Sequence, residues 1–593
     1  MLARLDDLLK KYHALSSWLL ILVAAIFFQK ILTCGFVYDD VALILMNPYI
    51  KNAHLWRQVF LTPMWSFLGH EAQGTFYRPL GVFLFWLVCR VAGLNPAPYH
   101  LLQMILYSLG IWMVYRIGRE LLPSEPAALA GALLWTLHPL HVEAVAWLSA
   151  IPDIACGLFC LLGFAMFLRA EGQSPPAFRH HVLAAAVFFP ALFFKEFAFT
   201  FPLLILAYWF CFSSGESWLR RALDWLPYVG AAVICAVIRV TLMGRFSSTS
   251  LLRGFKPQVA WAAIGLLGEH AKLFFWPVNL TAGRAFDLSA SLHSPWPWAT
   301  LVILGLAVAT RKHDPLLSFL VLWWLVLLLP CLDYRQLSFP FVEDQFSYLP
   351  SVGLCLALAY VAFVWAPRRF PKLHPTPVAV GAVAVVAALW AVQIVRTVPH
   401  WRDNDTMFDY ALRVAPNSAP VRVSHGVVLQ LRDNDLIGAA HEFQMALKLN
   451  AQSLRPITAV AYDSYIGLGQ IALHQGREAE GIDYLNRATH LLPHFGFAYV
   501  VLGSVYFPRG DYARAAGYFR QAVSANPLDT NARFYLGTCM MKLAQPAQAA
   551  EQFRAAREVD PDYFQAYEAE ARALEAVGDG AGAARVRRLE AGH

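Results

Sequence analysis

Two adjacent carboxylates, Asp39 and Asp40, stand directly after the first long apolar run of the sequence. Adjacent carboxylates at a membrane edge can share a metal ion, or one of them can stay basic enough to take a proton from a hydroxyl group. The simpler interpretation is that they only mark the end of a membrane span. The pair is therefore a candidate catalytic or metal site, with Asp40 as the candidate metal ligand.

Further polar residues follow the expected end of a helix at Pro139. His141 and Glu143 come directly after this proline, and Asp153 stands at the start of the next apolar run. We expect these side chains in an outer loop that faces the same water as the acidic pair. A structural turn in which Asp153 caps the following helix explains the same pattern.

Lys195 and Glu196 are adjacent charges between two apolar runs. Charges flanked by apolar sequence are costly at membrane depth, so each is a candidate for function until a structural partner is found. The alternative is a mutually neutralised pair at an outer turn.

The elements that position these residues are predicted to be membrane spans, because 58% of the 593 residues are hydrophobic and only 15% are charged. A net charge of +7 is modest, and we expect no nucleic-acid binding. The nine cysteines have no CxxC or Cys/His ligand spacing. We predict about eleven spans, centred on residues 17–35, 98–116, 126–137, 153–169, 180–194, 197–213, 222–242, 296–310, 315–331, 346–366 and 376–397.

The basic loops predict a cytoplasmic N-terminus, because Lys and Arg accumulate in cytoplasmic loops. These loops hold Arg116 and Arg119, Arg169 and Arg179, Arg220 and Arg221, Arg311 and Lys312, and Arg368, Arg369 and Lys372. Two more apolar stretches, 79–93 and 259–277, are then expected to lie at the outer interface. The predicted outer segments are 36–97, 138–152, 243–295, 332–345 and the C-terminal third.

From residue 462 the sequence repeats with a period of 34. Each unit has Leu-Gly near its start, small residues and an aromatic or leucine at fixed points, and a closing proline; the pattern includes Leu468-Gly469, Leu502-Gly503, Leu536-Gly537, Leu485, Phe519, Phe553, Pro493, Pro527 and Pro561. This register is typical of tetratricopeptide repeats. An earlier unit holds Phe443, and a half unit with Phe408, Ala411 and Pro416 begins directly after the last span.

Several motifs occur in one order along the chain. They are Phe36-Val37-Tyr38-Asp39-Asp40, Phe76-Tyr77-Arg78-Pro79-Leu80, the HPLHVEAVAW segment ending in Asp153, Lys195-Glu196, Trp276-Pro277-Val278-Asn279-Leu280 and Asp344-Gln345-Phe346-Ser347-Tyr348-Leu349-Pro350. With the repeats, this order resembles the transmembrane-and-tetratricopeptide-repeat protein O-mannosyltransferase family and its bacterial relatives, within the GT-C glycosyltransferase superfamily.

The resemblance implies an all-α protein with a polytopic GT-C-like transmembrane catalytic domain over 1–397 and an extracytoplasmic tetratricopeptide-repeat α-solenoid over 398–593. It implies inverting transfer of mannose or another hexose from a polyprenyl-phosphate donor to Ser or Thr hydroxyls of extracytoplasmic proteins, with Asp39 and Asp40 as the catalytic or metal-binding carboxylates. The divalent ion would be Mg²⁺ or Mn²⁺.

The outer-loop cations available for the leaving phosphate are Arg78, Lys195, Lys272, Arg284 and Arg335. His141, Glu143, Asp153, Glu196, Asp344 and Gln345 are expected to complete the substrate site. Relatives commonly carry Arg where this chain has Gln345, so the phosphate contact would come from elsewhere or the donor differs. The apolar Ala150-Ile151-Pro152 before Asp153 is a second departure.

Two other functions remain open. A non-enzymatic scaffold would recruit partners through its repeats and would not need the carboxylates. A transporter is less well supported, since the charges gather near one membrane face instead of along a path through the midplane. The expected partners are membrane lipid and an acceptor peptide in the repeat groove. The expected location is a bacterial cytoplasmic membrane, with the endoplasmic reticulum membrane as the alternative.

Overall fold

The computed structural model describes residues 2–69, 76–173, 178–212, 217–243, 257–333, 335, 342–370, 375–432 and 434–591. Within these ranges the chain is helical, and its extended pairing is one isolated bridge between Arg284 and Val342. The all-α prediction is therefore confirmed. The chain forms two compact units: the membrane unit, Met1–Asp40 with Leu94–Pro416, and the repeat unit, Val41–Gly93 with Asn417–His593.

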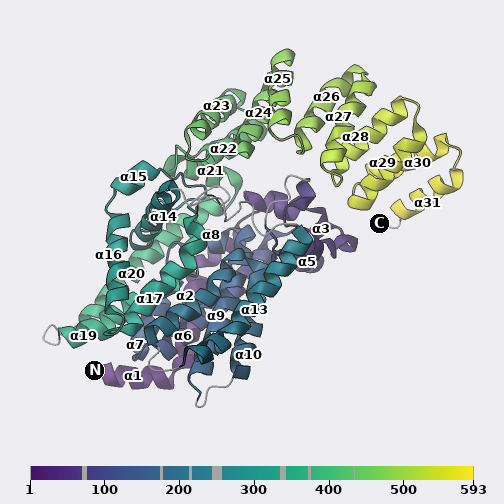
Figure 1. Ribbon diagram of the computed structural model, residues 1–593. Coiled ribbons are helices and arrows are strands. Elements are labelled where there is room, and N and C mark those ends of the chain that lie inside the picture. Colours follow the sequence, from purple (N-terminus) through teal and green to yellow (C-terminus); the bar gives the residue numbers. More distant parts are fainter. Residues whose placement is uncertain are drawn as a thin grey trace. The chain divides into compact units, whose positions relative to one another are not determined.

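The membrane unit is a bundle of long helices joined by short turns (Figure 1). Its elements are α1 (Leu2–Lys11), α2 (His13–Phe28), η1 (Gln29–Thr33), α6 (Pro96–Leu121), α7 (Glu125–Thr136), α8 (His141–Ala146), η5 (Leu148–Ala150), α9 (Ile151–Glu171), α10 (Phe178–Phe188), α11 (Ala191–Phe194), η6 (Glu196–Thr200), α12 (Phe201–Phe212), α13 (Trp218–Met243), α14 (Pro257–Phe275), α15 (Leu288–His293), α16 (Trp296–Thr310), α17 (Pro315–Leu328), η7 (Leu329–Leu332), η8 (Asp344–Ser347), α18 (Ser351–Tyr360), η9 (Val361–Trp365), α19 (Ala366–Arg369), α20 (Pro375–Thr397), η11 (Val398–Trp401) and α21 (Asn404–Val414).

Among the described residues, seven helices are long and apolar enough to cross a bilayer, which makes this a membrane protein. They are His13–Thr33, Pro96–Leu121, Leu148–Glu171, Trp218–Met243, Pro315–Leu332, Ser351–Arg369 and Pro377–Trp401. Four shorter apolar helices are Pro79–Ala92, Phe178–Phe194, Glu196–Phe212 and Trp296–Thr310. The predicted span at 126–137 corresponds to α7, which has only 12 residues. The number of crossings stays a prediction.

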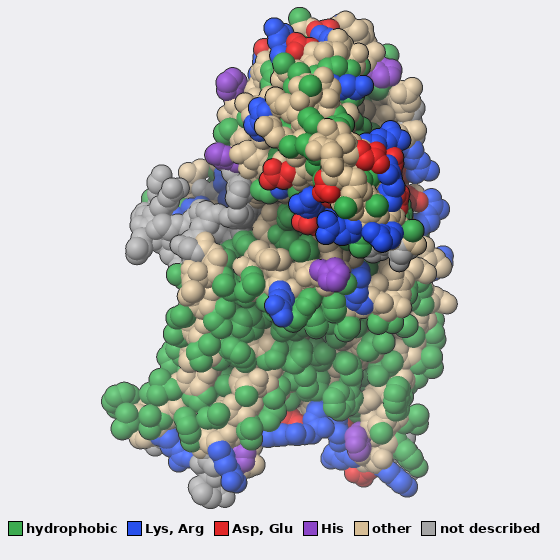
Figure 2. Space-filling view, turned by 90° about the vertical axis from the view of Figure 1, so that its right-hand side faces the viewer, with side chains coloured by type: hydrophobic (Ala, Val, Ile, Leu, Met, Phe, Trp, Pro, Cys, Tyr) green, Lys and Arg blue, Asp and Glu red, His purple; other side chains and the backbone are tan. Residues whose placement is uncertain are grey.

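Basic loops meet at one end of the membrane unit. Asp6 of α1 accepts a hydrogen bond from the backbone N–H of Glu125 at 2.8 Å, and Arg119 pairs with Glu125 at 2.7 Å. Arg221 pairs with Glu171 at 2.6 Å. Figure 2 shows a broad band of hydrophobic side chains with Lys and Arg along its lower edge, the end where α1, α10 and α19 lie in Figure 1. The predicted topology stays a prediction, and Lys372 lies outside the described residues.

The repeat unit is a stack of helix pairs. Its elements are η2 (Val41–Leu45), α3 (Pro48–Lys51), η3 (Ala53–Leu55), α4 (Gln58–Leu61), η4 (Ser66–Leu68), α5 (Pro79–Ala92), α22 (Ala419–Leu431), α23 (Leu436–Gln452), α24 (Thr458–His474), α25 (Glu478–Leu491), α26 (Phe497–Tyr506), η12 (Phe507–Arg509), α27 (Tyr512–Ala525), α28 (Thr530–Lys542), α29 (Pro546–Val559), α30 (Gln565–Ala576) and α31 (Gly580–Glu590). A Cβ on Gly503 would lie 2.8 Å from the Phe519 ring, and one on Gly537 would lie 2.8 Å from Phe553. The 34-residue pattern therefore records close helix packing, and the repeat prediction is confirmed.

The compact units group residues differently from the predicted boundary at 397/398. Segment 41–93 packs with the repeats: Lys51 pairs with Asp560 at 3.0 Å, and the side-chain amide of Asn52 donates to the backbone oxygens of Glu558 at 2.8 Å and Val559 at 3.3 Å. The last two contacts satisfy carbonyl groups at the end of α29, because the helix has no further turn whose N–H groups could donate to them. Helix α21, the predicted half repeat, belongs instead to the membrane unit.

Candidate functional site

The site begins at a tight turn after η1. Tyr38 has a backbone φ of +53°, an uncommon value for a residue with a large side chain. Asp40 closes the turn, because one of its carboxylate oxygens accepts from the backbone N–H of Val37 at 3.1 Å. The other oxygen accepts from the backbone N–H of Ser149 at 2.7 Å and from its hydroxyl at 2.6 Å. Asp40 therefore joins this turn to η5, which leads into α9.

Asp40 is fully buried, and burial raises its pKa to about 7 although the hydrogen bonds from Ser149 and Val37 lower it. Asp39 is half-buried, and it lies close enough to Glu343 for its charge to raise the pKa of that residue. The two adjacent carboxylates thus have different surroundings. Asp40 braces the backbone, whereas Asp39 belongs to a group of acidic side chains.

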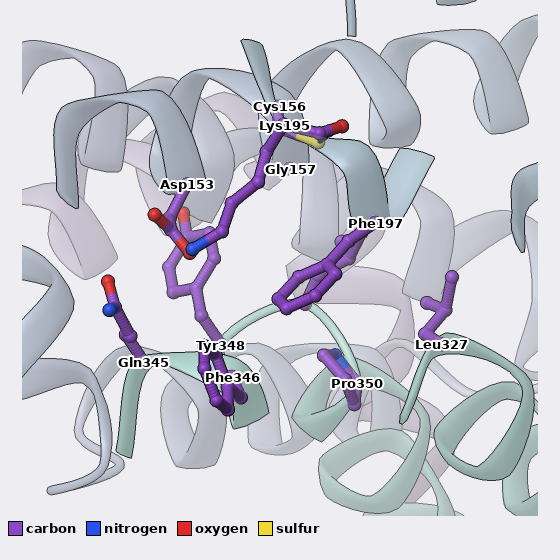
Figure 3. Close-up of a pocket in the computed structure, with 11 residues that line it drawn as sticks. Asp153, Cys156, Gly157, Lys195, Phe197, Leu327, Gln345, Phe346, Tyr348 and Pro350 are labelled. Carbon is purple, nitrogen blue, oxygen red and sulfur yellow. Dashed lines mark hydrogen bonds and ion pairs between the residues drawn. The ribbon is translucent and has the colours of Figure 1, made fainter. Parts of the chain in front are cut away.

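Asp153 and Lys195 form a buried ion pair between two helices of the membrane unit. Asp153 lies in the first turn of α9, where a carboxylate is also stabilised by the helix dipole. Lys195 follows α11 in an extended conformation that turns its side chain toward Asp153 (Figure 3). Its ammonium group lies 4.9 Å from the ring centre of Phe197 and 5.4 Å from that of Phe346. The predicted pairing of Lys195 with Glu196 is replaced by this contact.

Glu196 pairs instead with Arg239 at 3.2 Å. Arg239 is a buried arginine within the apolar helix α13, and it was not among the predicted site residues. The rule that charges inside apolar runs are functional candidates would have found it, since it interrupts the run at 222–242.

The acidic loop consists of residues 342–347 and completes the site. Glu343 accepts a hydrogen bond from the side-chain amide of Gln345. Burial raises the pKa of Glu343 to about 7; Lys195 and the Gln345 hydrogen bond lower it, and the Asp153 and Asp39 carboxylates raise it. Glu343 was missed in the sequence because it precedes the Asp344-Gln345 motif without being part of it.

The acidic loop is fixed from both sides. Glu143 of α8 accepts from the backbone N–H of Gln345 at 3.0 Å, at the start of η8. Asp344 pairs with Arg284 at 3.5 Å, and Arg284 also donates to the backbone oxygen of Asn279 at 2.9 Å. Burial raises the pKa of Asp344 to about 6, and the adjacent guanidinium lowers it. Four predicted residues, Glu143, Arg284, Asp344 and Gln345, therefore lie together.

A small cavity of about 20 Å³ lies at the buried end of the site, which is room for about one water molecule. Asp153, Lys195 and Gln345 line it together with the rings of Phe197, Phe346 and Tyr348 (Figure 3). This cavity presents a cation and a carboxylate over an aromatic wall, an arrangement that can bind a polar group.

Other predicted residues have different surroundings. His141 is buried, its ring hydrogen-bonds with the hydroxyls of Tyr107 at 3.2 Å and Ser351 at 3.0 Å, and burial holds its pKa well below the usual range. Lys272 pairs with Glu269 at 3.3 Å and is largely exposed, and Arg335 pairs with Asp333 at 2.8 Å. These contacts support structural roles for His141, Lys272 and Arg335.

Arg78 lies in the repeat unit, at the start of α5, with its guanidinium 4.5 Å from the ring centre of Phe76. Its predicted role toward a phosphate stays a prediction.

Asp40 does not fit the predicted role of a metal ligand, because both of its carboxylate oxygens already accept hydrogen bonds. The part of the chain that the structure describes contains no group of three His, Cys, Asp or Glu side chains arranged to hold a metal ion. A metal requirement stays a prediction.

The membrane unit and the repeats each match known families. A family model described as dolichyl-phosphate-mannose-protein mannosyltransferase matches residues 77–242, and two tetratricopeptide-repeat models match 428–494 and 507–576. The chain is similar to protein O-mannosyl-transferases. The resemblance inferred from the ordered motifs is thereby confirmed.

Among the relatives, human protein O-mannosyl-transferase TMTC3 is 25% identical over 78% of this chain and 53% of its own length. Protein O-mannosyl-transferase F38B6.6 of Caenorhabditis elegans is 23% identical over 73% of this chain and 62% of its own. Drosophila melanogaster Tmtc1 is 33% identical over 25% of this chain and 17% of its own. The chain thus spans less than two thirds of the length of each of these relatives.

Two solved structures to which the chain is similar are those of YrrB and MamA. YrrB, a TPR protein with an unusual peptide-binding site, is 23% identical with a TM-score of 0.25 over 31% of this chain and 90% of its own. MamA is 19% identical with a TM-score of 0.24 over 29% of this chain and 89% of its own.

Proposed function

We propose that this chain is a membrane glycosyltransferase of the GT-C type. It would transfer mannose or another hexose from a polyprenyl-phosphate donor to Ser or Thr hydroxyls of extracytoplasmic proteins. The observation that carries the proposal is the convergence of Asp39, the Asp153–Lys195 ion pair and Glu343 from four segments of the membrane unit. The mannosyltransferase family model and the names of the relatives support the same reaction.

Asp39 is the carboxylate that we assign as general base. Asp40 is fully buried, whereas Asp39 is half-buried and can be reached by an acceptor hydroxyl. In the reaction the acceptor hydroxyl oxygen forms a bond to the anomeric carbon while the bond from that carbon to the donor phosphate oxygen breaks. The hydroxyl proton passes to Asp39, and attack from the opposite face inverts the anomeric centre.

The leaving phosphate takes the electron pair of the broken bond and needs cations nearby. Lys195 is buried and Arg284 is partly buried, and each already faces a carboxylate, Asp153 or Asp344. Charge-assisted hydrogen bonds from such groups stabilise a developing phosphate anion. Lys195 would contact the phosphate through the cavity that it lines.

The membrane location supports a lipid-linked donor, since its tail would lie among the apolar helices while its phosphate meets the charged end of the site. The repeats would bind the acceptor polypeptide on the extracytoplasmic side. The membrane would be a bacterial cytoplasmic membrane or, as the alternative, that of the endoplasmic reticulum.

The test is glycopeptide mass spectrometry on cells that express the wild-type chain, no chain, or the Asp39→Asn variant. A matched control is Asp483→Asn in α25, whose side chain is 57% exposed on the repeats. We expect hexose additions on extracytoplasmic proteins with the wild-type and Asp483→Asn chains, and their loss in the other two strains. Equal additions in all strains would contradict the proposal.

The second candidate is a scaffold that recruits partners through its repeats, which the tetratricopeptide matches favour. It predicts that Asp39→Asn has no effect in cells, whereas changes in the repeats remove function. The same strains, scored for growth and for proteins that co-purify with the chain, separate the two functions.

A further inference from the structure

Helix α21 touches the turn that carries Asp39. The side-chain oxygen of Asn404, in the first turn of α21, accepts a hydrogen bond from the backbone N–H of Tyr38 at 2.7 Å. Just before it, the backbone oxygen of Arg402 accepts from the N–H of Gly35 at 2.8 Å. These are contacts within the membrane unit, which contains both segments.

The Tyr38 ring is held on two sides. Phe408 of α21 meets it edge-on, with ring centres 5.8 Å apart, and the Trp147 ring lies 5.6 Å away. Trp147 in turn stacks on Trp401 at 6.4 Å. The contacts of Phe408 and Trp401 thus anchor this turn to the segment that follows the last span.

Tyr38 needs such support, because a positive φ costs a non-glycine residue of the order of 1–3 kcal/mol and persists only where neighbouring groups enforce it. A change of Tyr38 to an ordinary backbone conformation would rotate the next peptide and move the Asp39 side chain. Asp40 restrains the turn on the opposite side through Val37 and Ser149.

The other side of α21 faces the acidic loop. Tyr410 stacks on His400 with ring centres 3.8 Å apart. Burial raises the pKa of Tyr410, and the charge of Asp344 raises it further, so this ring lies near the Asp344–Arg284 pair. One short helix therefore approaches both parts of the site.

We propose that Asn404 is a positioning residue for Asp39. Together with Phe408 it fixes the strained backbone of Tyr38 and so sets the orientation of the Asp39 side chain. This rests on the proposed function, in which Asp39 takes the proton of the acceptor. It assigns α21, the half repeat that joins the spans to the solenoid, a part in the reaction.

The test compares Asn404→Leu, which removes the hydrogen-bond acceptor at similar volume, with Asn404→Asp, which keeps an oxygen at the same place. Full-length chains in lipid nanodiscs are assayed with polyprenyl-phosphate mannose and an acceptor protein found by the mass spectrometry above. We expect Asn404→Leu to lower kcat about 10- to 100-fold with KM for both substrates unchanged, because misplacing a catalytic group by about 1 Å has effects of this size. Asn404→Asp should retain most of the activity.

A second measurement does not depend on turnover. Hydrogen exchange followed by mass spectrometry should show faster exchange in residues 35–40 of Asn404→Leu than in the wild type, with exchange across the repeats unchanged. If Asn404→Leu does not fold, Phe408→Leu replaces it in both measurements, with the same expected directions.

The outcomes separate the two proposals. A wild-type chain with no transfer activity contradicts the proposed function, whereas an active wild type with an equally active Asn404→Leu or Phe408→Leu variant contradicts only the role of Asn404. Faster exchange without a change in kcat also overturns it, because the hydrogen bond would then stabilise the turn without positioning the base.

Discussion

Charged groups gather at both ends of the membrane unit, but in different balance. At the basic end, Glu125 pairs with Arg119 and Glu171 pairs with Arg221. At the end that carries the site, the carboxylates influence one another: burial raises the pKa of Glu343, and the charges of Asp153 and Asp39 raise it further. Paired charges of the first kind hold loops together, whereas crowded acids of the second kind are typical of sites that move protons or bind cations.

The comparison explains why burial of a charge is not by itself a sign of function. Both ends contain buried or half-buried carboxylates, so exposure alone does not distinguish them. What differs is how many acids share one cation, because Lys195 pairs with Asp153 and at the same time lowers the pKa of Glu343. The predictions below test that difference, beginning with the largest effect.

Lys195→Met leaves Asp153 buried without its ammonium partner. Removing one member of a buried ion pair typically costs about 3–5 kcal/mol, so we expect a large drop in the thermal unfolding temperature and no transfer activity. The double variant Lys195→Met/Asp153→Asn should regain stability but not activity. A double variant that regains activity would contradict the role of Lys195 at the phosphate.

Asp40→Asn tests whether Asp40 holds the turn in place while Asp39 acts as the general base. An asparagine retains one acceptor oxygen but brings an NH₂ group against either the N–H of Val37 or the groups of Ser149. The resulting unsatisfied contact should lower the free energy of unfolding by about 1–3 kcal/mol. Asp39→Asn should remove transfer and lower the unfolding temperature less than Asp40→Asn does, because Asp39 is half-buried and Asp40 is fully buried. Thermal melts and turnover of both variants check this contrast.

Arg221→Met tests the basic end. Loss of the partner of Glu171 should destabilise the protein by about 1–3 kcal/mol, since both side chains are partly buried. Activity per folded molecule should remain at the wild-type level, because the site is formed at the other end of the helices. A lower kcat in the folded fraction would mean that the two ends are coupled.

Glu343→Gln should change the pH dependence of stability. In the folded protein the pKa of Glu343 is raised to about 7, above that of an unfolded glutamate near 4.3. Its contribution is therefore fully present below the unfolded pKa and is lost as the pH rises through about 7. Between these values wild-type stability should fall with pH more steeply than that of Glu343→Gln. Denaturant unfolding of both proteins at pH 5, 6, 7 and 8 gives the comparison. The same dependence of unfolding free energy on pH in both would contradict the burial assigned to Glu343.

The repeats were predictable because their determinants are local. A glycine such as Gly503 or Gly537 must face an aromatic ring in the same unit, so packing leaves a period of 34 in the sequence. The long apolar spans were predictable for the same reason, since bilayer thickness fixes the length of each run. Short helices such as α7 carry a weaker signal, and the crossing number depends on them.

The sequence also identified most charged residues of the site, because charge is rare in apolar surroundings. It could not tell Asp39 from Asp40, because the two adjacent residues are distinguished by burial and by contacts such as that of Asp40 with Ser149, which lies 109 positions away. The partner of Lys195, the inclusion of Glu343 and the docking of Asn404 on Tyr38 were likewise decided by long-range contacts.

The sequence by itself determined the apolar helices, the repeat period and the order of the motifs, since these follow from residue types and spacing along the chain. Only the tertiary structure decided that Asp40 holds the turn, that Lys195 pairs with Asp153 and Arg284 with Asp344, and that α21 packs in the membrane unit. Those outcomes depend on burial and on contacts between segments that are distant in the chain, and neither leaves a pattern in a single sequence.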